Sequence, residues 1–156
     1  MSRIIEYSLD GAGWAVGSLN FAEQKIELDT SYIVDTFADM ANAILAICEG
    51  MSTASWDYFH GPTSTRVTLQ APDGELEMMV VRYADIHFGP IPIDVNGELL
   101  AKKLVSIDRL VSDVIVAGSR MLKAHGAEGY KQLFRREFPI SEIEMLRTFR
   151  RASKKN

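Results

Sequence analysis

The chain contains 156 residues, of which 47% are hydrophobic and 24% are charged, and its formal net charge is −4. These values exclude a disordered or low-complexity chain and predict a single domain over residues 1–156 with one hydrophobic core. The one cysteine, Cys48, permits no internal disulfide and is expected on the apolar face of a helix. No apolar run approaches ~18 residues, so we expect no membrane-spanning segment and a cytoplasmic location.

The first part of the sequence predicts three short strands. Residues 4–9 (IIEYSL) alternate between apolar and polar side chains, which is typical of a half-buried strand, and the glycines at 11 and 13 indicate a turn. Two further runs, WAVGSLNFA at 14–22 and KIEL at 25–28, predict strands that meet near Glu23. The three strands are expected to form an antiparallel meander.

From Ser31 to Glu49 the apolar residues follow the spacing of an amphipathic helix. Thr30 or Ser31 can cap the start of this helix through a side-chain hydroxyl, and Gly50 is expected to end it. Its expected buried face consists of Ile33, Phe37, Met40, Ala41, Ile44, Leu45 and Cys48.

The middle of the sequence returns to strand patterns. A short strand is expected at 56–59, and the runs RVTLQ at 66–70 and ELEMMVVRY at 75–83 predict a hairpin. Pro72, Asp73 and Gly74 are expected to form the turn of this hairpin. Prolines at 90 and 92 then indicate an irregular loop.

The last third of the sequence predicts helices. Helical spacing begins at Leu100 and continues to Leu122, which predicts a long helix that Gly126 ends. The run AEGYKQLF adds a short helix, and another is expected after Pro139. The predicted fold class is therefore α+β: a mostly antiparallel β-meander of about five or six strands packed against two main α-helices, with short C-terminal helices.

The stretch DGAGWAVGSLNF, at 10–21, offers two interpretations. Its glycines follow a strand, as they do in loops that hold the phosphates of a nucleotide, but such a loop leads directly into a helix. Gly17 would lie inside that helix, where glycine is unfavourable. We therefore favour a hairpin turn at Gly11 and Gly13 and a close backbone approach at Gly17, with Trp14 packed at the start of the second strand.

Three polar residues suggest an alternative enzymatic or metal-binding function. Asp85 and His87 are two residues apart beyond the hairpin, so an extended backbone places both on one face, and His60 can approach them in space. Such a set can transfer a proton or bind a metal ion. The sequence contains no paired-histidine, paired-cysteine or nucleophile motif that would add further metal ligands or catalytic residues to this set.

Acidic and aromatic residues indicate a protein partner instead. The first half of the chain carries most of the uncompensated acid, which argues against a general nucleic-acid binder and favours a basic protein partner. The aromatic residues at 130, 134 and 138 are spaced by four, so they are expected to pack together and not to stack on bases. Trp56 and Tyr58 are candidate anchors if they are exposed. An acidic surface is expected from Asp29, Asp35, Asp39, Asp57 and Asp85, and the residues expected to bind the partner are Asp35, Asp39, Trp56, Asp57, Tyr58, His60, Asp85 and His87.

The order of these features resembles small bacterial immunity-type and uncharacterised proteins encoded beside secreted toxins. The resemblance rests on GWA at 13–15, SYIVDTFADMANAIL at 31–45 and EGYKQLFRREFP at 128–139, and it covers nearly the whole chain. This chain has FHGPTS at 59–64, where similar sequences tend to place acidic residues near an E-P-G turn. The resemblance implies a sheet packed on helices, no catalysis, and inhibition of a toxin by tight binding.

The leading hypothesis is thus a non-catalytic immunity protein that masks the active surface of a cognate toxin domain. We expect no cofactor, no metal, no nucleic acid and no membrane partner. A homodimer is the alternative assembly to the complex with a toxin. Two alternatives remain: a small enzyme or metal-binding domain that uses Asp85, His87 and His60, and a small-ligand or regulatory module. A pocket between the sheet and the helices would favour the second alternative.

Overall fold

The computed structural model describes residues 3–72 and 74–155, which form seven strands and three helices. The strands are β1 (Ile5–Leu9), β2 (Trp14–Phe21), β3 (Gln24–Ser31), β4 (Thr53–His60), β5 (Thr63–Gln70), β6 (Glu77–Tyr83) and β7 (Glu98–Leu104). The helices are α1 (Thr36–Cys48), α2 (Ile107–Phe134) and α3 (Ile140–Lys154). None of these helices is both long enough and apolar enough to span a membrane within the described residues.

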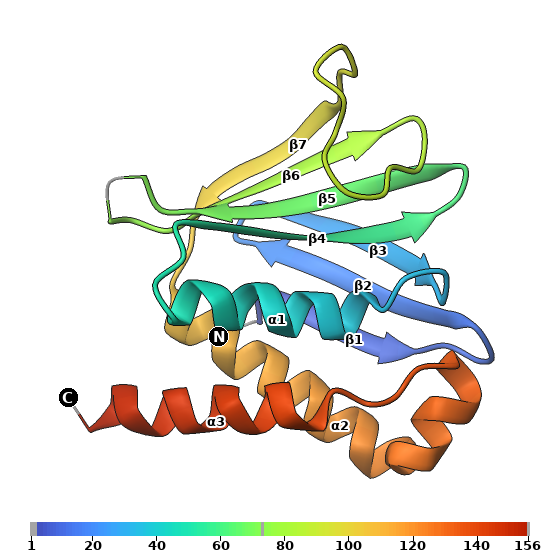
Figure 1. The fold of residues 1–156 in the computed structure, drawn as a ribbon, viewed down its shortest axis with the longest axis vertical. Coiled ribbons are helices and arrows are strands. Elements are labelled where there is room, and N and C mark those ends of the chain that lie inside the picture. The colour runs from blue at the N-terminus through green and yellow to red at the C-terminus, as the bar shows by residue number, and fades with distance from the viewer. Residues whose placement is uncertain (1–2, 73, 156) are drawn as a thin grey trace.

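The strands form two antiparallel sheets with the orders β1-β2-β3 and β4-β5-β6-β7. Figure 1 shows the four-stranded sheet at one end of the long axis, α2 and α3 at the other end, and α1 between them. The predicted α+β class and antiparallel pairing are confirmed. The expectation of a single meander of five or six strands is wrong, because the described residues form seven strands in two separate sheets. The strands of one sheet precede α1 in the sequence, and those of the other follow it.

The opening stretch forms a hairpin and no phosphate-binding loop. β1 pairs with β2 in a register that places Ile5 opposite Leu19 and Leu9 opposite Ala15. Gly11 and Gly13 have φ angles of 75° and 82°, which glycine adopts without strain. A Cβ atom on Gly17 would lie 2.8 Å from the carbonyl oxygen of Leu28, so the expected close backbone approach is confirmed.

Helix α1 begins later than the sequence pattern predicts. Thr30 and Ser31 belong to β3, and the side chain of Asp35 caps the helix by accepting a hydrogen bond from the backbone N–H of Ala38 (3.2 Å). Ile33 therefore lies in the connection before the helix, where it is exposed, and not on the helix's buried face. The predicted end is confirmed, because α1 stops just before Gly50.

A chain of buried hydroxyl groups joins the two sheets to α1. The backbone N–H of Phe59 in β4 donates to Thr30 Oγ1 (3.0 Å), which is bonded to Thr36 Oγ1 (3.0 Å). Thr36 Oγ1 in turn donates to the backbone carbonyl of Asp57 (2.9 Å). Both threonine side chains are completely buried, so these bonds replace bonds to water.

The sequence pattern at the beginning of β7 is misleading. Leu100 and Leu104 fit the spacing of a helix, but they lie in a strand that pairs with β6. The helix α2 begins only at Ile107, where Ser106 Oγ accepts a hydrogen bond from the N–H of Arg109 (3.4 Å). Pairing with β6 outweighs the local preference, since strand formation depends on the neighbouring strand more than on the segment itself.

The remaining predicted elements are close to those observed. β5 and β6 form the expected hairpin, although Asp73 of its turn lies outside the described residues. Gly126 interrupts α2 with non-helical backbone angles, so the short helix predicted after it is confirmed as the last part of α2. α3 begins directly after Pro139, as predicted, but it is a full helix of 15 residues.

The buried apolar side chains form one cluster between the sheets and the helices. Tyr7 of β1 stacks on Phe37 of α1, with 5.3 Å between the ring centroids. Tyr130, Phe134 and Phe138 are all buried in this cluster, which confirms the predicted packing stripe. Cys48 is half-buried at its edge, and burial raises the pKa of its thiol to about 11.

Candidate functional site

Three of the predicted partner-binding carboxylates lie near one another at the first turns of α1. Asp35 caps the helix, and Asp39 follows one turn later. Asp57 is brought close on β4, because its backbone carbonyl accepts the bond from Thr36. The Asp57 carboxylate accepts two hydrogen bonds from the guanidinium of Arg66, at 2.8 and 3.1 Å. Asp57 is therefore paired, whereas Asp39 is the exposed carboxylate of the group.

The electrostatics of Asp39 reflect this proximity. Partial burial raises its pKa from 3.8 to about 6, with further increases from the negative charges of Asp35 and Asp57. The pKa of Asp35 is also raised, mainly by burial. Arg136 opposes both shifts but does not cancel them. This part of the surface consequently carries negative charge that a cationic partner would stabilise.

Exposed aromatic and aliphatic side chains lie beside these carboxylates. Tyr32 and Ile33 are 39% and 50% exposed, respectively, whereas Trp14 belongs to the outer face of the three-stranded sheet, which points away from α1. The backbone N–H of Tyr32 donates to the carbonyl of Gly13 (3.1 Å), which joins the β1–β2 turn to the connection between β3 and α1. That connection leads directly to Asp35, so apolar and acidic groups are neighbours on one surface.

Two arginines hold the connection before α1 against the end of α2. The guanidinium of Arg135 lies over the Tyr32 ring, 4.9 Å from its centroid. Arg136 Nη2 donates to the backbone carbonyls of Tyr32 (3.0 Å) and Ile33 (2.9 Å). These contacts fix the position of the backbone that carries the exposed Tyr32 ring. Tryptophan, tyrosine and arginine are the residues that most often dominate protein–protein binding.

A shallow hollow of about 360 Å³ continues this surface between α1 and the start of α3. Its walls include the carboxylates of Asp35, Glu137 and Glu142, together with the half-exposed side chain of Ile140. The acidic–aromatic surface, as we call it from here on, consists of Tyr32, Ile33, Asp35, Asp39, Ile140 and Glu142.

The predicted anchors Trp56 and Tyr58 do not belong to this surface. They are 1% and 0% exposed, because both point from β4 into the core. Trp14 is 48% exposed, although the sequence pattern predicted that it packs at the start of the second strand. Because the neighbouring Ala15 is buried, the alternation of buried and exposed residues along β2 was the sequence signal for the exposure of Trp14. The signal was ambiguous because the buried face of β2 carries Ala15 and Gly17, which are small residues.

The residues of the predicted catalytic or metal-binding set have separate partners. His60 ends β4, and Asp85 and His87 lie in the loop after β6. The ring nitrogens of His60 are bonded to the hydroxyls of Thr63 (2.7 Å) and Thr65 (3.1 Å). His87 packs edge-on against Tyr83 in the β6–β7 loop. Within the described residues, no three His, Cys, Asp or Glu side chains are grouped closely enough to hold a metal ion, so this trio forms no such site.

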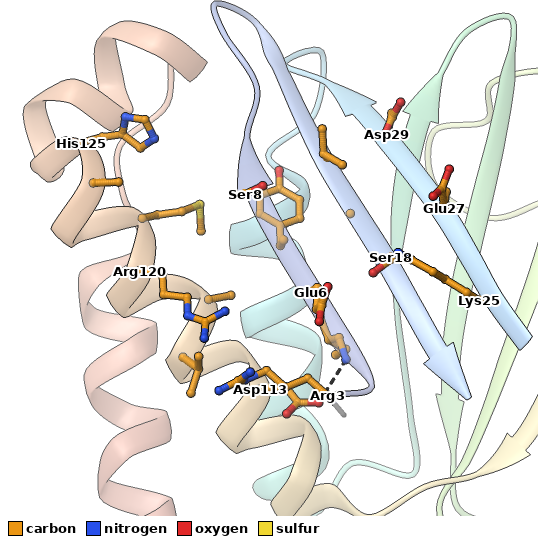
Figure 2. Close-up of a pocket in the computed structure, with 18 residues that line it drawn as sticks. Arg3, Glu6, Ser8, Ser18, Lys25, Glu27, Asp29, Asp113, Arg120 and His125 are labelled. Carbon is orange, nitrogen blue, oxygen red and sulfur yellow. Dashed lines mark hydrogen bonds between the residues drawn. The ribbon is translucent and has the colours of Figure 1, made fainter. Parts of the chain in front are cut away.

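A second, larger hollow lies between the outer face of β1-β2-β3 and α2, with a volume of about 550 Å³. Figure 2 shows Arg120 and His125 on α2 at one side of this groove and Glu27 and Asp29 on β3 at the other. At its lower end, Asp113 Oδ2 accepts hydrogen bonds from the backbone N–H groups of Ile4 (2.8 Å), just before β1, and Ile5 (3.1 Å), its first residue. The sequence reasoning did not identify this groove.

Comparison with known proteins gives no match to a family, to a curated protein or to a solved structure. The function therefore has to be inferred from the residues themselves.

Proposed function

We propose that the protein is a non-catalytic immunity protein that binds a cognate toxin domain and masks its active surface. The partner recognised by the acidic–aromatic surface would be basic around an apolar centre. Its apolar side chains would pack on Tyr32 and Ile33, and its lysines or arginines would pair with Asp35 and Asp39.

The observation that carries this proposal is the position of exposed Tyr32 and Ile33 directly before the carboxylates of Asp35 and Asp39. Large rings exposed to water are unfavourable unless a partner covers them, and tryptophan and tyrosine provide large contact area with little loss of side-chain entropy. The hollow beside Ile140 adds a depression into which a partner side chain can fit. A basic partner also gains rapid, electrostatically steered association with this surface.

The experiment is co-expression with the toxic domain encoded by the neighbouring gene. Wild-type protein should restore growth and form an isolable complex with that domain. Asp39→Lys should lose both effects, because it replaces attraction by repulsion at an exposed position. The control Ile93→Ala, in the β6–β7 loop, removes a fully exposed side chain outside this surface and should still restore growth. If the wild-type protein neither binds the domain nor restores growth, the immunity assignment is wrong.

One observation favours a second function, that of a small-ligand module. The groove between the three-stranded sheet and α2 has the size of small-molecule sites, which are typically ~300–1,000 Å³. It lies on different elements from the hollow between α1 and α3, so the two functions do not exclude each other.

A further inference from the structure

The four-stranded sheet ends at β7, and the outer edge of this strand has no second strand beside it. Among the described residues, β7 pairs only with β6, and no backbone group of another segment bonds to residues 98–104. Figure 1 shows β7 as the outermost strand of that sheet. An edge strand presents a row of unpaired N–H and C=O groups, so it is a template for a further strand.

Three exposed side chains give this edge a distinct chemical pattern. The register with β6 leaves Leu100 without an opposite residue, and this bulge shifts the alternation along the strand. As a result, Leu99, Lys102 and Leu104 lie on the same face of the sheet. Ala101 is buried on the other face. Because Leu99 and Leu104 are 55% and 65% exposed, the edge presents a positive charge between two apolar side chains.

Lys102 is the unpaired charge of this edge. Within the described part of the chain, it forms no ion pair. The acidic residues near it have other partners: Glu98 pairs with Arg82 (3.9 Å), and Glu77 on β6 accepts a hydrogen bond from Gln70 (3.0 Å). A carboxylate placed beside Lys102 would therefore gain an attraction that the chain itself does not provide.

The turn between β2 and β3 already binds part of the β7 edge. Gln24 Nε2 donates to the backbone carbonyl of Leu100 (3.0 Å), and Glu23 forms an ion pair with Lys103. An amide donor and a carboxylate from another segment are thus the groups that this edge accepts. Both residues of the turn are exposed, and bonds at exposed positions contribute little to stability, so another segment can displace them.

We propose that the β7 edge binds an extended acidic segment of another protein as a further strand, with a carboxylate at Lys102 and apolar side chains at Leu99 and Leu104. The β2–β3 turn is then an internal competitor for the same edge. A second copy of the chain fits poorly, because lysines on an edge strand oppose pairing with an identical strand. The site is independent of the proposed toxin binding, since the acidic–aromatic surface contains no residue of β7.

The test is a calorimetric titration of the full chain with the peptide acetyl-Ser-Val-Thr-Glu-Thr-Val-Ser-amide. In an extended strand, its glutamate and two valines lie on one face, so the probe matches the pattern of the edge. One control peptide has lysine in place of glutamate. The other has proline in place of both threonines, so it keeps the charge but cannot pair as a strand. We expect saturable binding of the glutamate peptide only, and weaker binding as salt is added.

Variants assign the binding to the β7 edge. Lys102→Glu should weaken binding about tenfold or more, because it replaces attraction by repulsion. The matched control Lys123→Glu makes the same change of net charge on an exposed position of α2 and should bind like wild type. Circular dichroism checks that each variant is folded, and Lys102→Ala replaces Lys102→Glu if the latter is not.

A variant of the turn tests the competition directly. Gln24→Ala should strengthen peptide binding by about two- to fivefold, because it removes the hydrogen bond that competes for the carbonyl of Leu100. Hydrogen exchange locates the bound peptide, since the amides of residues 98–104 should exchange more slowly in its presence. A residue with only a structural role would produce neither effect.

Four results would overturn the proposal. They are no binding of the glutamate peptide at millimolar concentration, equal binding of either control peptide, undiminished binding by Lys102→Glu, and a Gln24→Ala variant that dimerises in the ultracentrifuge without binding the peptide. Unchanged affinity of Gln24→Ala would contradict the competition. Because Tyr32→Ala leaves every residue of β7 in place, it should bind the peptide like wild type. Failure of toxin binding and failure of peptide binding are therefore separate results.

Discussion

Trp14 lies at the beginning of β2 on the face opposite the buried Ala15, so nearly half of its side chain remains in contact with water. The adjoining Tyr32 ring packs over Gly13, where a Cβ atom would lie only 3.0 Å from it. A glycine at position 13 thus allows the turn and the ring to lie together. The position of the Tyr32 ring in the acidic–aromatic surface depends on this local arrangement.

A Tyr32→Ala variant should lose partner binding without losing its fold. Affinity for the toxin domain should fall by about 2 kcal/mol or more, as for a central aromatic contact. The free energy of unfolding should change by less than ~1 kcal/mol, because the side chain is 39% exposed. Calorimetric titration and urea unfolding measure the two quantities. A large loss of stability with unchanged affinity would place Tyr32 in a structural role.

Asp39 gives a prediction about pH. Its folded-state pKa, about 6, is above the ordinary value of 3.8, so the protonated carboxyl is favoured by folding. Its contribution to stability is complete below about pH 4 and is lost as the pH rises through about 6.

An Asp39→Asn variant should therefore be more stable than wild type at pH 7, by less than ~1 kcal/mol, since solvent screens the exposed carboxylate. This advantage should disappear below about pH 4, where wild-type Asp39 is also neutral. Urea unfolding at pH 7 and pH 3.5, a pH chosen just below the ordinary pKa of ~4, measures the difference. An advantage of equal size at both pH values would contradict the cause assigned to the raised pKa.

At the scale of elements, the buried threonines determine how α1 and the two sheets fit together. Removing the hydroxyl of Thr36 leaves the carbonyl of Asp57 without its hydrogen bond in a dry environment. Thr36→Val should therefore destabilise the fold by about 1–3 kcal/mol, although its shape is nearly unchanged.

The matched control for that variant is Thr36→Ser, which keeps the hydroxyl and loses only a methyl group. It should retain most of the stability that Thr36→Val loses, as measured by the midpoint of urea unfolding. Equal destabilisation by both variants would show that packing of the methyl group, and not the hydrogen bonds, holds the junction together.

Much of the element order can be predicted from the sequence, for reasons visible in particular residues. The β1–β2 hairpin, the end of α1 at Gly50 and the break at Gly126 all depend on local backbone geometry, which glycine reveals directly. β7 could not be predicted, because Leu100 and Leu104 suit a helix equally well and only β6 decides between them.

The candidate site was less predictable than the elements. The carboxylates of Asp35 and Asp39 could be identified, since their spacing on α1 follows from the helix. The exposure of Trp14 and the burial of Trp56 depend on which face of each sheet is covered. That information lies in contacts between distant segments, so a pattern within one strand does not contain it.

At the scale of the whole molecule, charge and exposed apolar groups are brought to the same end of the fold. Residues of the β3–α1 connection, α1 and the start of α3 contribute to the acidic–aromatic surface, although they are far apart in the sequence. Binding that depends on Asp39 should weaken as the pH falls from 7 to 5, because this range spans its pKa of about 6. Titration at the two pH values measures this change, and equal affinity would contradict an ionised Asp39 at the interface.

The most direct test of the central claim is the affinity between the purified chain and the toxin domain of the neighbouring gene, compared with that of a Tyr32→Ala, Asp39→Lys double variant. The account predicts tight binding by the wild-type chain and a loss of at least about 3 kcal/mol in the folded double variant, as expected when a hot-spot ring and a charge pair are removed together. Tight binding by both proteins would contradict it, because the toxin would then use another surface.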